Sequence, residues 1–153
     1  MVSMNDLVSI AAQIEANGQV FYSDLAQIQQ NPELKEFFTR LAEQERTHQQ
    51  IFKALAQKVE QSVSISNWIE DEVSGYLKSF AQVSIFPAME KAKQNLTLRQ
   101  ALDIAINVEK DSIIFYSELL KYAGDERKTI EIIINEEKKH LIDLLKVNHE
   151  QFG

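Results

Sequence analysis

The chain of 153 residues contains no cysteine, which excludes a disulfide framework, a thiolate metal site and a redox-active thiol. Any redox chemistry must therefore come from a bound metal or from electrons that another protein supplies. The chain also has only four glycines and two prolines, and strong helix formers dominate the segments between them. This composition predicts an all-α protein, and the length fits one domain over residues 1–153.

Long apolar runs and an excess of positive charge are missing as well. No stretch approaches the roughly 18 apolar residues that span a bilayer, and the N-terminus lacks a basic region followed by an apolar one. We therefore expect a cytoplasmic protein without a membrane partner. The formal net charge of −7 argues against nucleic acid as a partner, because phosphate binding requires a basic surface.

Residues that favour helix ends divide the chain into long helices. Asn31 followed by Pro32 is typical of a helix start, and Thr97 with Gln100 forms the pattern of a capping box. Gly124 is typical of the residue that follows a helix C-terminus. The other expected caps are Ser3 or Asn5 for the first helix and Asp125 for the fourth.

These ends predict four long helices and one long connection. Short links make the first and second helices, and the third and fourth, antiparallel hairpins. The connection over residues 60–97 should break the helix at its polar, β-branched start, and then form a short helix that ends before Phe86 and Pro87. This is the pattern of a four-helix bundle with one long crossover. The expected ranges are 6–30, 32–59, 98–123 and 125–147 for the long helices and 67–82 for the short one.

The two hairpins resemble each other in sequence. The segment EANGQVFYSDL at residues 15–25 matches EKDSIIFYSEL at residues 109–119, with a glutamate, Phe-Tyr-Ser, an acidic residue and leucine at the same offsets. Each half then carries one Glu-x-x-His unit, a motif that is weak when it occurs alone. Such a repeat predicts a pseudo-twofold bundle in which equivalent residues meet near the axis. The two units are Glu45/His48 and Glu137/His140.

Four glutamates lie on the apolar stripe that each helix should turn toward the core. Burying them alone would cost several kcal/mol each, and two divalent cations would remove that cost. Glutamate oxygens with imidazole nitrogens suit iron, manganese or zinc, and do not form an all-oxygen calcium cage. The expected ligands are Glu15, Glu45, His48, Glu109, Glu137 and His140.

Nearly the whole chain resembles the di-iron domain of the rubrerythrin family, within the ferritin-like superfamily. The resemblance implies two metal ions, iron first and manganese or zinc as alternatives, with Glu45 and Glu137 as bridging ligands. It also implies a non-haem oxidoreductase that reduces hydrogen peroxide or reacts with dioxygen, a homodimer, and a separate electron donor such as a rubredoxin. The motifs that carry the resemblance lie at residues 15–22, 41–48, 101–116 and 134–140.

The sequence departs from that family in two ways. Rubrerythrins have a second glutamate one turn after the first in the third helix, whereas this chain has Ser112, with Gly18 at the matching position of the first half. Glu90 and Asp111 are poor replacements, because Glu90 precedes the helix and Asp111 faces away from Glu109. The chain also lacks the Cys-x-x-Cys of a rubredoxin domain. These differences leave two other functions open: iron oxidation for storage or detoxification, and a metal-stabilised interaction module without catalysis.

The two tyrosines and the glycine near the expected ligands allow two interpretations each. Tyr22 and Tyr116 are either core residues or partners that orient a ligand carboxylate. Gly18 either leaves space for a small oxidant or permits a close contact between helices. His149 has no glutamate three residues before it, and we expect it to be exposed.

Overall fold

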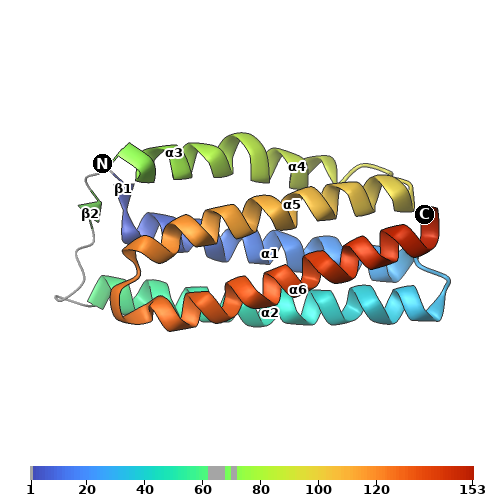
Figure 1. Cartoon of the computed structure of the whole chain (residues 1–153), viewed down its shortest axis with the longest axis horizontal. Helices are drawn as coiled ribbons and strands as arrows, with labels where there is room; N and C mark the ends of the chain where they lie inside the picture. The colour runs from blue at the N-terminus through green and yellow to red at the C-terminus, as the bar shows by residue number, and fades with distance from the viewer. Residues whose placement is uncertain (1, 62–67, 70–71) are drawn as a thin grey trace. The chain divides into compact units, whose positions relative to one another are not determined.

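The computed structural model describes residues 2–61, 68–69 and 72–153, and most of these residues are helical (Figure 1). The chain divides into two compact units, Ser3–Trp68 and Ile69–Gly153, the second of which includes Met1–Val2. We call them the N-terminal unit and the C-terminal unit. Each contains one pair of long helices, as the repeat in the sequence predicts.

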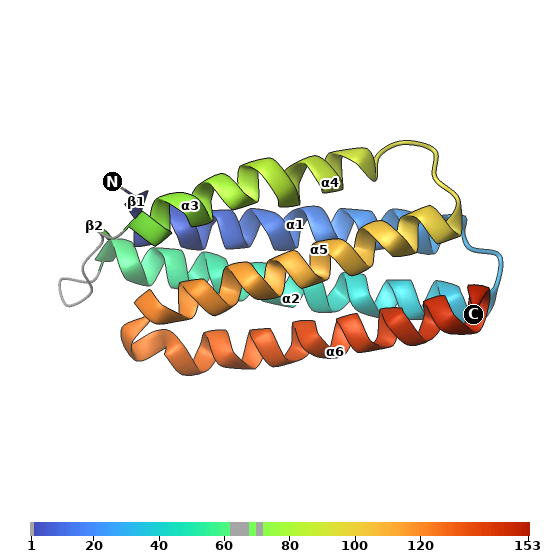
Figure 2. The ribbon, with the colours of Figure 1, turned by 45° about the horizontal axis from the view of Figure 1, so that its top comes forward.

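The N-terminal unit is a hairpin of two long helices, α1 (Met4–Ile28) and α2 (Pro32–Gln61), which run side by side in opposite directions (Figure 2). The expected cap at Ser3 is confirmed. Its Oγ accepts a hydrogen bond from the Asp6 N–H at 2.9 Å, and the Asp6 carboxylate accepts one from the Ser3 N–H at 3.1 Å. The Asn31 side chain accepts from the Glu33 N–H at 2.9 Å, as expected for a residue that begins a helix.

The C-terminal unit contains the second long pair, α5 (Leu98–Leu119) and α6 (Arg127–Phe152). Two 3₁₀ turns link them, η2 (Leu120–Tyr122) and η3 (Gly124–Glu126). The capping box of Thr97 and Gln100 is present, and Gly124 has the positive φ of 54° that its position after a helix predicts.

The predicted start and end of the last helix were both wrong. Asp125 does not cap it, because Asp125 lies inside η3 and the cap position falls on Glu126, whose side chain makes no capping hydrogen bond. The helix also continues past residue 147 to Phe152. The Arg99 guanidinium stacks over the Phe152 ring at 5.6 Å, which gives this last turn a contact with α5.

The crossover is more helical at its end than the sequence predicts. It comprises α3 (Glu72–Phe80), a π-helical turn η1 (Ala81–Ile85) and α4 (Phe86–Lys91), which follow one another without a break and lie along α5 (Figures 1 and 2). The expected stop before Phe86 and Pro87 was therefore wrong. Pro87 is the second residue of α4, which directly follows the π-helical turn, so its ring and missing N–H fall where the hydrogen-bond pattern of the helix changes. The predicted helix break falls mainly on residues 62–67, outside the described residues.

Two further features complete the fold. Two-residue strands, β1 (Val2–Ser3) and β2 (Trp68–Ile69), pair with each other, and they are too short to change the all-α class. Across residues 2–61, 68–69 and 72–153, no helix combines the length and apolar character needed to cross a membrane.

Candidate metal centre

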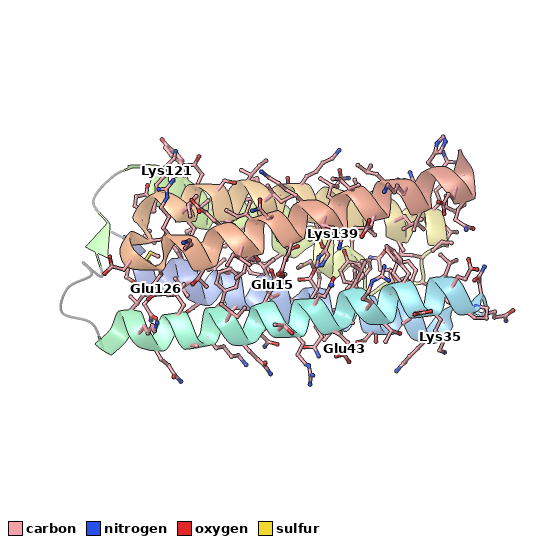
Figure 3. The ribbon with its side chains drawn as sticks, turned by 60° about the horizontal axis from the view of Figure 1, so that its bottom comes forward. Glu15, Lys35, Glu43, Lys121, Glu126 and Lys139 are labelled. Atoms are coloured by element: carbon pink, nitrogen blue, oxygen red, sulfur yellow. The ribbon has the colours of Figure 1, made fainter. Side chains whose placement is uncertain are left out.

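The N-terminal unit brings together a triad of potential ligands from both of its helices. Glu15 comes from α1, and Glu45 and His48 come from one face of α2, where a spacing of three residues places two side chains on the same side. One ligand atom of each residue lies within 4.8 Å of the others. Each residue is at most 3% exposed, and His48 Nδ1 lies 3.7 Å from Glu15 Oε1. Figure 3 labels Glu15 on α1, together with the exposed Lys35 and Glu43 on α2.

The C-terminal unit contains the corresponding triad. Glu109 comes from α5, and Glu137 and His140 come from α6, again with ligand atoms within 4.8 Å of one another. All three residues are at most 3% exposed. His140 Nδ1 lies 3.5 Å from Oε2 of Glu137 on the same helix. The prediction that the four glutamates point inward is confirmed in both units, whereas their binding of metal stays a prediction.

The residues one turn from the first glutamate of each triad are small, as the sequence indicates. A Cβ added at Gly18 would lie 3.4 Å from the carboxylate carbon of Glu45. Ser112 is buried, and its Oγ donates a hydrogen bond to the Val108 carbonyl at 2.7 Å. Neither position supplies a carboxylate to its triad.

The two acidic residues considered as replacements are engaged elsewhere. Asp111 accepts a hydrogen bond from the Ser84 hydroxyl in η1 at 2.7 Å. Glu90 is exposed and forms an ion pair with Lys93 at 3.1 Å. Both residues were expected to be poor candidates for a seventh ligand, and their partners agree with that expectation. The contact of Ser84 with α5 could not be predicted, since no sequence motif indicates such a hydrogen bond.

Tyr22 and Tyr116 are both buried in aromatic surroundings. The Tyr22 ring stacks on Phe38 with 6.4 Å between centroids and 12° between planes. The Tyr116 ring meets Phe115 edge-on at 5.9 Å. Their predicted core packing is confirmed, and the role of their hydroxyls in orienting a ligand carboxylate stays a prediction. His149, the third histidine, is exposed as expected.

The chemistry of each triad fits a transition metal or zinc. Two carboxylates and one imidazole, withdrawn from water, form a mixed oxygen and nitrogen donor set of the kind that iron, manganese and zinc accept. Two buried carboxylates close together also repel each other, and a divalent cation removes that repulsion. The residues present therefore fit the metal that the donor pattern predicts.

Comparisons with known proteins agree with this arrangement. No curated protein matches the chain. Among solved structures, it is similar to a candidate ferritin-like diiron-carboxylate protein from Thermotoga maritima, with 32% identity and a TM-score of 0.74 over 98% of this chain and 97% of that one. This similarity confirms the predicted fold class, all-α and ferritin-like. The rubrerythrin family model matches residues 6–147. The chain therefore belongs to the rubrerythrin family.

Proposed function

We propose that the two triads act together as one site for two iron ions, and that the protein is a non-haem di-iron oxidoreductase. The observation that carries the proposal is the presence of two buried triads of identical composition, one in each half of a sequence repeat. A single triad could be explained by chance on glutamate-rich helices. Two triads at matching offsets, each from both long helices of its unit, are hard to explain without a ligand for each.

The family and the similar structure support the number and kind of metal. The match to the rubrerythrin model spans both triads, and the Thermotoga maritima protein carries the description of a diiron-carboxylate protein. The residues that would hold the two ions are Glu15, Glu45 and His48 from the N-terminal unit, and Glu109, Glu137 and His140 from the C-terminal unit.

The chain's own residues would hold, orient and shield such a site. Six protein ligands shared by two ions leave coordination positions for a small oxidant. Phe38, Phe52 and Tyr116 are buried on helices that carry ligands, and their rings would help to keep bulk water away from the site. When one imidazole nitrogen binds metal, the other can donate a hydrogen bond, which would fix the orientation of the ring.

The reaction that we propose is the two-electron reduction of hydrogen peroxide, with dioxygen as the alternative oxidant. Bound ferrous iron would supply the electrons, and two electrons with two protons convert one peroxide molecule into two water molecules. A separate protein such as a rubredoxin would restore the electrons, because this chain has no cysteine to hold an iron–sulfur centre.

Anaerobic loading with Fe(II) followed by hydrogen peroxide tests this proposal. We expect two Fe(II) ions to bind per chain, and ferric absorbance to rise faster with peroxide than with dioxygen. The variant His48→Ala/His140→Ala should lose binding and rapid oxidation. The matched control is His149→Ala, which removes an exposed histidine of the same helix as His140 and should behave as wild type. Equal oxidation rates in the double variant and the wild type would refute the proposal.

Size-exclusion chromatography separates this function from iron storage. A redox enzyme of this family is expected to be a homodimer, whereas storage requires a large closed shell that retains ferric iron after turnover. Retention of many ferric ions per chain in a large assembly would favour storage. Absence of bound metal after native purification, with a chelator that leaves the melting temperature unchanged, would instead indicate a non-catalytic interaction module.

A further inference from the structure

The glycine in the middle of α1 lies beside a ligand of the first triad. Gly18 is buried one turn after Glu15, and glycine is the poorest helix former after proline. A Cβ built at Gly18 would have as its three nearest atoms Cδ, Oε2 and Cγ of Glu45, at 3.4, 3.5 and 3.6 Å. None of these three atoms belongs to a backbone, so a close approach of two helix backbones does not explain the glycine.

The gap beside Gly18 is too narrow for a separate molecule. A methyl side chain at Gly18 would lie at bonding distance from the Cα. An atom of a separate molecule cannot come so close, because it must stay about 3.5 Å from that Cα. A bonded methyl already reaches ordinary contact distance from the Glu45 carboxylate. A free oxidant would therefore collide with Glu45 unless that side chain moved first.

The corresponding position in the C-terminal unit is built differently. The repeat aligns Gly18 with Ser112, which has a Cβ and a hydroxyl that is fixed on the Val108 carbonyl at 2.7 Å. Of these two aligned positions, only Gly18 lacks a side chain, and it lies next to the Glu45 carboxylate of the first triad.

We propose that Gly18 is a positioning residue, whose missing side chain leaves room for the Glu45 carboxylate to change rotamer when a ligand enters the metal site. A methyl group at Gly18 would contact the carboxylate carbon, one oxygen and Cγ together, and would so block rotation of the carboxylate on that side. The first triad is then the adaptable half of the site. This inference rests on the proposed dimetal site and adds to it which carboxylate moves.

The test compares wild type, Gly18→Ala and the matched control Ser112→Ala after loading with Co(II). Azide serves as the small anionic probe, and the visible absorption of Co(II) reports its binding. In crystals of the wild type and of Ser112→Ala, we expect the Glu45 carboxylate to occupy different rotamers with and without azide. In Gly18→Ala it should keep one rotamer. Azide affinity in this variant should fall by about two- to tenfold, the factor that corresponds to an unfavourable rotamer.

The outcomes separate this inference from the function on which it rests. Binding of fewer than two Co(II) ions by the wild-type protein would overturn the proposed dimetal site and the inference with it. Normal Co(II) binding by all three proteins, with Glu45 moving in Gly18→Ala as it does in wild type, would overturn the role of Gly18 alone. An equal loss of azide affinity in Ser112→Ala would also overturn it, because the effect would then not depend on the gap beside Glu45.

Discussion

Nδ1 of His48 lies 3.7 Å from Oε1 of Glu15, a residue of the neighbouring helix, whereas Nδ1 of His140 lies 3.5 Å from Oε2 of Glu137 on its own helix. Each triad therefore contains a close approach between its histidine and a carboxylate. In the N-terminal unit this approach joins α1 to α2, and in the C-terminal unit it lies within α6.

Replacing a buried ligand carboxylate by its neutral isostere should stabilise the metal-free protein and weaken metal binding. Glu45→Gln removes a negative charge from a buried cluster, so we expect the free energy of unfolding without metal to rise by about 1–3 kcal/mol. Urea unfolding with and without Co(II) measures both effects, and the stabilisation by Co(II) should shrink. The control Glu43→Gln lies two residues away on the exposed side of α2 and should change neither quantity. A less stable metal-free Glu45→Gln protein would contradict the prediction.

The two buried tyrosines allow the hydroxyl group to be tested separately from the ring. Tyr22→Phe and Tyr116→Phe keep the aromatic packing on Phe38 and Phe115. If the hydroxyls orient ligand carboxylates, each variant should lose about tenfold in Co(II) affinity by competition with a chelator, which is the usual effect of removing such a partner. Phe115→Leu changes packing without removing a hydroxyl and serves as the control. Unchanged affinity in both Tyr→Phe variants would leave the tyrosines with a packing role only.

The hydrogen bond between Ser84 and Asp111 attaches the π-helical turn of the crossover to α5. Its length is 2.7 Å and its acceptor is a partly buried carboxylate, so Ser84→Ala should lower the free energy of unfolding by about 1–2 kcal/mol. A double-mutant cycle with Asp111→Asn measures the coupling by chemical denaturation. Ser79→Ala, an exposed serine of α3, is the matched control. A coupling energy of zero would show that the contact contributes nothing to stability.

Replacement by alanine should change the stability of the protein in opposite directions at two glycines. Gly124 has φ +54°, a conformation that costs other residues about 1–2 kcal/mol, so Gly124→Ala should destabilise the protein by that amount. Gly75 lies inside α3, and a Cβ added there would meet no atom within 4 Å, so Gly75→Ala should stabilise the protein by about 1 kcal/mol through helix propensity. Thermal unfolding of the two variants checks the difference in sign. Stabilisation by both substitutions would show that the conformation at Gly124 carries no strain.

The N-terminal caps of three long helices could be predicted because they depend on contacts within four residues, whereas most other helix ends differ from the predicted ones. Ser3, Asn31 and Thr97 bond to the first turn of the helix that follows, so their types alone indicate their function. The continuation through Pro87 could not be predicted in this way. A proline near a helix start favours either an end or a new beginning, and the choice depends on how η1 and α4 pack along α5. The last turns of α6 likewise depend on the contact between Arg99 and Phe152.

The candidate site, like the helix ends, could be predicted only in part. The inward direction of Glu15, Glu45, Glu109 and Glu137 followed from helical periodicity, because the period of an α-helix fixes which face a residue occupies. Periodicity does not fix rotamers, however. The approach of His48 to Glu15, and the position of Glu45 beside Gly18, required the packing of two helices and could not be obtained from spacing.

Each triad is contained in one hairpin, and this has a consequence for the order of folding. The chain between Glu15 and Glu45, and between Glu109 and Glu137, is a single helix–turn–helix, so the entropy lost on closing each loop is modest. Contacts of such short sequence separation form early in helical proteins. Each hairpin can therefore gather three ligands before the long crossover is ordered, and a metal ion present during synthesis could be captured by the first hairpin while the second is still being translated.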